Sequence, residues 1–121
     1  MKPVKYNVNQ ATKIDLGTKL IYKYPTPTKQ FDIAHMVLNG RHPKEKNSYI
    51  LEHGCMFAMF IIKGNGTVYA GDEIFTVYVD DVVVVPTDNK FAVEGNMEYI
   101  TFDLPAYYPE QSEEIKSKQF S

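Results

Sequence analysis

The sequence has no tryptophan and only one cysteine, Cys55, so a disulfide within the chain is impossible. A lack of disulfides is typical of proteins from reducing compartments. The first residues, MKPVKYNVNQATKIDLG, contain no apolar signal core. No apolar run in the sequence approaches the roughly 18 residues of a membrane-spanning helix. We therefore expect a cytoplasmic protein.

A surplus of either charge is also absent. The 121 residues include 13 Lys and Arg against 15 Asp and Glu, for a net charge of −2. Binding to nucleic acid or to an anionic membrane depends on clustered positive charge, so we expect neither partner. The hydrophobic fraction of 44% is that of an ordinary globular chain. We expect one domain over residues 1–121, with its core barrel at about 33–104.

Long helical patterns are missing as well. Glycine and proline recur between short runs rich in β-branched and aromatic residues, which predicts an all-β sandwich or barrel. The only helical candidate is PEQSEEIKSKQ, with Pro109 in its first turn. Hairpins are predicted at KGNGTV and at Gly71-Asp72. Strands are expected at residues 4–8, 20–24, 33–38, 48–53, 55–62, 67–70, 74–79, 82–85, 91–93 and 98–104.

Two apolar runs lack the alternation of a half-exposed strand. They are CMFAMFII, at 55–62, and VVVV, at 82–85. Continuous apolar character predicts strands that are covered on both faces. One face would look into the barrel, and the other would be covered by the N-terminal segment or by another subunit. We expect a homodimer; the alternative is a monomer in which the first forty or so residues do all the covering.

The last predicted strand has two faces of different character. The face with Tyr99, Thr101 and Asp103 is the more polar one. The face with Glu98, Ile100, Phe102 and Leu104 is more apolar, so we expect it to be buried and Asp103 to be exposed.

Three residues mark an ordered framework in the central region. A strand ends at Gly64, and Asp80 and Pro86 follow in DDVVVVPTDNKF. Cupins carry the motifs G-x5-H-x-H-x3–4-E-x6-G and G-x5-P-x-G-x2-H-x3-N, and residues 45–95 resemble this pair. Gly64 takes the last glycine of the first motif, Asp80 the opening position of the second, and Pro86 its proline. The resemblance implies a small RmlC-like jelly-roll barrel, with an N-terminal β extension and a short C-terminal helix or tail.

The metal-binding positions of the two motifs are not kept. The resemblance puts the histidines and the glutamate of the first motif at Leu51, His53 and Phe57, and the histidine of the second at Phe91. Metal-binding cupins use those four side chains, and only His53 is retained here. A lone imidazole does not make a tight transition-metal site, so we expect no metal and no cofactor.

His53 is the candidate catalytic residue, because an imidazole inside a barrel can hydrogen-bond a ligand or move a proton. The alternative is a partly buried histidine satisfied by a backbone group or by water. Arg41, in the loop NGRHPKEKN, is a candidate for binding a carboxylate or phosphate at the barrel mouth; otherwise it is a solvated charge. The predicted ligand contacts are His53, Leu51, Phe57, Met59, Phe91 and Arg41.

Cys55 lies two residues from His53, so both side chains share a face of a regular strand. A thiolate and an imidazole can begin a nucleophilic site. Gly54 between them favours a bulge, and a small buried hydrophobe is the preferred interpretation of Cys55.

Three functions remain open from the sequence. The first is a cupin-like protein that binds a small molecule in its barrel without the usual metal site. The second is a metal-independent isomerase, epimerase or lyase that acts on a sugar or small acid. The third is a structural dimer whose barrel is filled by its own side chains, such as Phe57 and Phe91.

Overall fold

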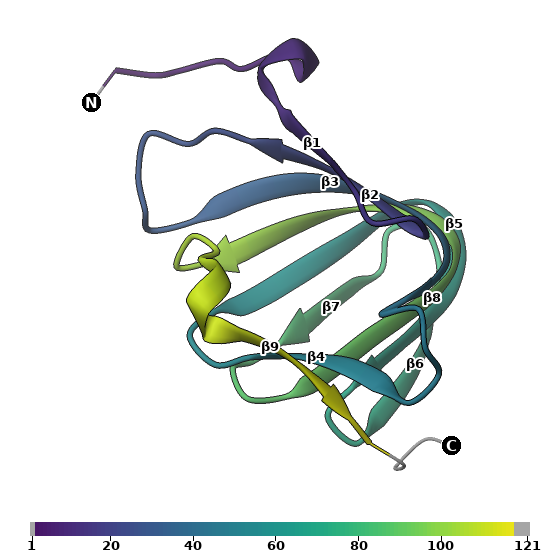
Figure 1. Cartoon of the computed structure of the whole chain (residues 1–121). Coiled ribbons are helices and arrows are strands. Elements are labelled where there is room, and N and C mark those ends of the chain that lie inside the picture. Colours follow the sequence, from purple (N-terminus) through teal and green to yellow (C-terminus); the bar gives the residue numbers. More distant parts are fainter. Residues whose placement is uncertain (1, 118–121) are drawn as a thin grey trace.

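One antiparallel β-sheet makes up most of the chain and curls into a half-barrel (Figure 1). The computed structural model describes residues 2–117, and this part of the chain contains no α-helix. The all-β prediction is therefore confirmed. The elements are η1 (Val8–Gln10), β1 (Thr12–Asp15), β2 (Lys19–Tyr24), β3 (Asp32–His42), β4 (Ser48–Glu52), β5 (Met56–Ala70), β6 (Glu73–Val77), β7 (Val82–Val85), β8 (Lys90–Leu104), η2 (Pro109–Gln111) and β9 (Ser112–Lys116).

The long strand β8 organises the sheet. It pairs with β3 along one edge, with β5 along the other, and with β4 near its start. The sheet therefore runs β1-β2-β3-β8-β4-β9, while β5 also pairs with β6 and β7. In Figure 1, β1 to β3 lie at the top and β4 and β9 at the bottom, and they face one another across the interior.

Alternate side chains of these strands fill the interior, as the period of two in a β-strand requires. The aromatic and aliphatic residues of β5 and β8 form most of the core, and β3, β6 and β7 complete it. The buried members are Ala34, Met36, Leu38, Phe57, Met59, Ile61, Val68, Val77, Val83, Val85, Phe91, Val93, Met97 and Tyr99.

The four valines of β7 are not buried on both faces of the strand. Val83 and Val85 point into the core, whereas Val82 and Val84 are 57% and 55% exposed. The N-terminal residues do not cover the outer face, so the alternative of a monomer in which the first forty or so residues do all the covering is wrong. β1 pairs with β2 instead, and the residues before it extend away from the barrel (Figure 1).

The predicted hairpin at KGNGTV is also wrong, because β5 continues through Gly64 and Gly66. A Cβ on Gly64 would lie 2.2 Å from the carbonyl oxygen of Asn96, and one on Gly66 would lie 2.4 Å from that of Glu94. These glycines let β5 bend closely over β8 where the register shifts between Ile61 and Lys63. The hairpin at Gly71-Asp72 is confirmed between β5 and β6.

The two ends of the chain differ from the sequence prediction. The expected C-terminal helix is a single 3-10 turn, η2, followed by β9, which pairs with the free edge of β4. Pairing with an open sheet edge outweighs the weak local helix preference of this segment. At the N-terminus, the strand expected at 4–8 is not formed, and the β extension is β1, preceded by η1 with its Asn7 and Gln10 capping box.

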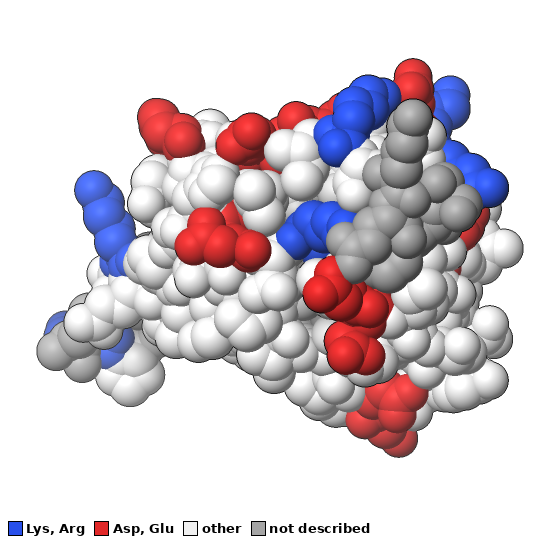
Figure 2. All heavy atoms as spheres, turned by 90° about the horizontal axis from the view of Figure 1, so that it is seen from below, with Lys and Arg blue, Asp and Glu red and all other residues white. Residues whose placement is uncertain are grey.

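The described residues include no helix that is long and apolar enough to cross a membrane. On the face shown in Figure 2, acidic and basic side chains are mixed, and neither sign forms a continuous field. This distribution agrees with the near-balanced charge of the sequence.

Candidate functional site

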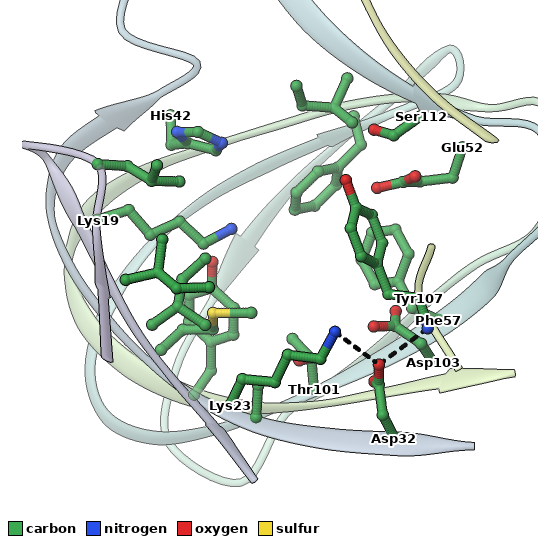
Figure 3. Close-up of a pocket in the computed structure, with 18 residues that line it drawn as sticks. Lys19, Lys23, Asp32, His42, Glu52, Phe57, Thr101, Asp103, Tyr107 and Ser112 are labelled. Atoms are coloured by element: carbon green, nitrogen blue, oxygen red, sulfur yellow. Dashed lines mark hydrogen bonds and ion pairs between the residues drawn. The ribbon is translucent and has the colours of Figure 1, made fainter. Parts of the chain in front are cut away.

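A pocket of about 310 Å³ lies inside the half-barrel, between β1 to β3 on one side and β4, β8 and the segment after β8 on the other. Its volume falls at the lower end of the range for small-molecule sites. Apolar residues of β1, β2 and β3 and two rings form much of the wall. The polar lining residues include Lys19, Lys23, Asp32, His42, Glu52, Thr101, Asp103, Tyr107 and Ser112 (Figure 3).

Two phenylalanines form an aromatic wall of the pocket. The ring centroids of Phe57 and Phe91 are 4.9 Å apart with an edge-to-face angle of 86°. Both side chains are buried, yet both line the pocket. An edge-to-face pair of this kind holds its rings in fixed positions, so it offers a rigid apolar surface to a ligand.

His42 and Lys19 lie together on one side of the pocket (Figure 3). Burial, and then the nearby Lys19 and Arg41, lower the pKa of His42 to about 4, so its imidazole is uncharged at neutral pH. Burial also lowers the pKa of Lys19 to about 8, although Asp103 and Glu52 act against this shift. This side of the pocket therefore combines an imidazole that can accept a proton with an ammonium that can stabilise negative charge.

Carboxyl groups gather on the opposite side of the pocket (Figure 3). Asp32 accepts a hydrogen bond from the backbone N–H of Tyr107 at 2.8 Å and lies 3.6 Å from the Lys23 ammonium. Burial, and then the adjacent Asp32, raise the pKa of Asp103 to about 8. At neutral pH Asp103 therefore holds a proton, which it can donate.

Two residues that line the pocket carry a buried hydroxyl group without a hydrogen-bond partner in the described part of the chain. These groups are the Tyr99 hydroxyl and Thr101 Oγ1, on residues that are 0% and 5% exposed. A buried hydroxyl without a partner costs free energy, so such groups are rare unless a bound molecule satisfies them.

These pocket residues include the clearest error of the sequence prediction. Tyr99 and Thr101 are buried and Asp103 lines the pocket, whereas Phe102 and Leu104 are 40% and 47% exposed. Apolar character suggested the opposite orientation of β8. The face of β8 with Tyr99, Thr101 and Asp103 points inward because the interior contains a pocket. The sequence alone does not indicate that such a pocket exists.

Comparisons with known proteins identify the architecture. No protein-family model matches the chain, and no curated protein matches it. A variant of Streptomyces PAC13 with uridine superposes at a TM-score of 0.85 and 16% identity, over 96% of this chain and 93% of that one. An RmlC-like cupin from Shewanella frigidimarina gives a TM-score of 0.71 at 14% identity, over 87% and 93% of the two chains. Ectoine synthase from P. lautus gives 0.72 at 11%, over 95% and 91%.

The chain has an RmlC-like cupin fold. Pac13 is described as a nucleoside dehydratase, and its structure matches this chain at a TM-score of 0.85 and 15% identity, over 95% of this chain and 92% of that one. Identities this low show a shared fold and do not transfer an activity.

The residues of this chain at the four metal-binding positions of cupins do not fit a metal ion. Leu51, Phe57 and Phe91 have no lone pair to give, and His53 points to the surface. Within residues 2–117, no three His, Cys, Asp or Glu side chains group as metal ligands would. A transition-metal site needs several converging donors, so the residues at these positions do not fit a metal ion.

His53 is not inside the cupin barrel, so its predicted placement is wrong. The side chain is 47% exposed and lies between two carboxylates, with Asp88 at 2.8 Å from Nδ1 and Glu113 at 2.7 Å from Nε2. It follows the end of β4, where the chain turns before β5, and this turn directs the ring outward. Its hydrogen bonds to Glu113 and Asp88 raise the pKa of His53.

The other predicted contacts divide between pocket and framework. Phe57 and Phe91 line the pocket, whereas Met59 is fully buried in the core and Leu51 lies on β4 outside the pocket lining. Arg41 points to the other side of β3 from His42, where Nη1 donates to the carbonyl oxygens of Pro43, Glu45 and Ser48. It thus holds the loop after β3 in place and does not reach the pocket.

Cys55 is a buried side chain, 1% exposed. Burial raises the pKa of its thiol to about 11. A thiol with so high a pKa is not a nucleophile at neutral pH, so the pairing of His53 with Cys55 does not form a reactive site.

Proposed function

We propose that this protein binds a small molecule with a flat ring and a hydroxylated sugar, such as a nucleoside, in the cupin pocket, and that it catalyses a lyase reaction on it by side-chain acid–base chemistry. The observation that carries the proposal is the pair of unpartnered hydroxyl groups, Tyr99 and Thr101, in a pocket walled by Phe57 and Phe91. Sugar hydroxyls would hydrogen-bond to Tyr99 and Thr101, and a flat ring would pack on Phe57 and Phe91.

The comparisons support the same class of ligand. Three structures of PAC13 variants, one with a histidine replaced by glutamine and two with a tyrosine replaced by phenylalanine, contain uridine. All three superpose on this chain at a TM-score of 0.85. The pocket described here also contains one histidine and two tyrosines, His42, Tyr99 and Tyr107.

The proposed reaction is the elimination of water from a substrate with a carbonyl group beside the carbon that loses its proton. The imidazole of His42 takes that proton, and the ammonium of Lys19 stabilises the enolate oxygen that forms. The C–O bond at the next carbon then breaks, and the departing hydroxide takes the proton of Asp103 to leave as water. His42 and Asp103 lie on opposite sides of the pocket, which suits removal and delivery of protons at different atoms (Figure 3).

The first test is binding. Calorimetric titration of the wild-type protein with uridine should show saturable binding, and ribose or uracil alone should bind more weakly because each fills only part of the pocket. Absence of binding by uridine, other nucleosides and carbonyl-bearing nucleosides alike would overturn the proposal.

The second test is turnover by His42→Gln. Glutamine keeps a hydrogen-bonding group of similar size but cannot act as the base. We expect uridine binding within about 3-fold of wild type and dehydration of a carbonyl-bearing nucleoside at least ~100-fold slower, as measured by mass spectrometric detection of water loss. His53→Gln is the matched control, since its imidazole lies outside the pocket, and it should leave turnover unchanged.

Binding without turnover is the second candidate function, and the same assays separate it from the first. The observation in its favour is the low pKa of His42, about 4, which makes the imidazole a weak base. Wild-type protein that binds uridine and never converts a carbonyl-bearing nucleoside would be a binding protein. The pocket of about 310 Å³ argues against the third function, a barrel filled by its own side chains.

A further inference from the structure

The outer face of the sheet opposite the pocket is apolar and uncovered. Large hydrophobic side chains of β5, β7 and β8 on this face are between 39% and 57% exposed. They are Met56, Phe60, Ile62, Val82, Val84, Phe102 and Leu104. We call this surface the outer apolar face.

Strand register makes the outer apolar face continuous. Phe60 lies between Val82 of β7 and Ile100 of β8. The next row places Ala58 between Val84 and Phe102, and the row after that places Met56 beside Leu104. Neighbouring residues in one row are in side-chain contact distance, so the face is a single patch and not a scatter of exposed residues.

Nothing in the described part of the chain covers this face. The N-terminal residues pack along β2 or extend away from the barrel, and β9 lies on β4 (Figure 1).

The charges at one end of the face are an ion-paired cluster around Glu98 and two acidic residues. Glu98 lies 2.8 Å from His35 and 3.7 Å from Lys63, and Asp80 and Asp81 precede β7 at the same end. Such a rim presents no surplus of positive charge to an anionic membrane. A second copy of the same face meets no strong like-charge repulsion across the apolar centre.

We propose that the outer apolar face is the interface of a homodimer, in which two copies pack face to face about a two-fold axis. A two-fold interface uses the same patch on both copies, so it needs a surface that is flat, apolar and free of unpaired charge at its centre. The seven large side chains and the partly exposed Ala58 and Ile100 between them give a patch of the order of the ~800 Å² that each partner buries in a stable complex.

Val84→Lys tests the proposal, because it puts a charge in the middle of the interface on a side chain that is 55% exposed in one chain. Sedimentation velocity over a range of micromolar concentrations should show a dimer for wild type and a monomer for the variant, with the dimer dissociation constant raised at least ~100-fold. Ile74→Lys, at a residue that is 56% exposed on β6 outside the face, is the matched control and should remain a dimer.

A second measurement needs no variant. In a mixture of differently labelled wild-type chains, NMR contacts between copies should join the methyl groups of Val82 or Val84 to the rings of Phe60 or Phe102. Either of two results overturns the proposal. The first is a wild-type protein that stays monomeric at every concentration, whether or not it binds anionic vesicles. The second is a Val84→Lys protein that is as dimeric as wild type. Loss of the dimer in Ile74→Lys as well would also count against this face.

Discussion

The two histidines at positions 42 and 53 show how burial decides the chemistry of one side-chain type. Burial lowers the pKa of His42 to about 4, whereas hydrogen bonds to Glu113 and Asp88 raise the pKa of His53. His42 is therefore neutral in the pocket at neutral pH, whereas the two carboxylates beside His53 favour its charged form. His53 joins the turn after β4 to β9 and to the loop before β8.

This surface cluster predicts a pH dependence of stability. An unfolded histidine titrates near pH 6.5, and the raised pKa of His53 means that folding takes up a proton. Its stabilising contribution is complete below about pH 6.5 and is lost as the pH rises through the folded-state pKa. Urea unfolding should therefore show that His53→Ala lowers the free energy of unfolding more at about pH 5.5 than at about pH 9.

The control for this prediction keeps the imidazole and removes its partners. In the double variant Asp88→Asn and Glu113→Gln, the pKa of His53 returns towards its ordinary value, so a further His53→Ala change should have little effect at either pH. If His53→Ala in the otherwise wild-type protein lowers the free energy of unfolding equally at both pH values, the two carboxylates do not stabilise the fold through protonation of His53.

At the residue scale, the sequence predicted the aromatic wall of the site but not its polar groups. Phe57 and Phe91 followed from counting along the cupin motifs, and both line the pocket. The predicted position of His53 inside the barrel is wrong because the turn at Gly54 and two carboxylates far along the chain orient its ring outward. The sequence around His53 shows neither of these influences. Lys19 and Asp103 were missed since a charged side chain is expected at the surface unless a cavity is known to exist.

At the scale of strands, most elements fall where β-branched and aromatic runs predict them. The failures share one cause, which is that pairing with distant strands outweighs local turn and helix preferences. The pattern KGNGTV predicts a turn at Gly64 and Gly66, but both residues lie inside the long strand β5, where its backbone approaches β8 closely. β9 likewise forms because β4 offers an open edge.

Gly64 provides the test of this account of β5. It combines a φ of +77° with a neighbouring carbonyl oxygen that would lie 2.2 Å from an added Cβ. We expect Gly64→Ala to lower the free energy of unfolding by ~1–3 kcal/mol, measured by urea denaturation. Gly17→Ala is the matched control, because its φ of +85° is similar but no atom lies within 4 Å of the added Cβ. Equal effects of the two substitutions would show that backbone conformation alone, and not the close approach to β8, requires glycine at 64.

At the scale of the whole molecule, the alternation of one strand separates two surfaces. Thr101 and Asp103 of β8 face the pocket, whereas Phe102 and Leu104 belong to the outer apolar face. The two proposals of ligand binding and self-association thus rest on opposite sides of the same sheet. No residue of the outer apolar face lines the pocket.

This separation predicts that two substitutions have independent effects. Thr101→Val removes an unpartnered buried hydroxyl and keeps the shape of the side chain, so the free protein should be at least as stable as wild type, while uridine binding should weaken about 3- to 10-fold. Val84→Lys should abolish the dimer and leave the uridine dissociation constant unchanged. Calorimetric titration and sedimentation of both variants complete the comparison. If Val84→Lys stays folded but binds uridine as weakly as Thr101→Val, the sheet transmits a change from one face to the other, and the pocket is shaped by dimerisation.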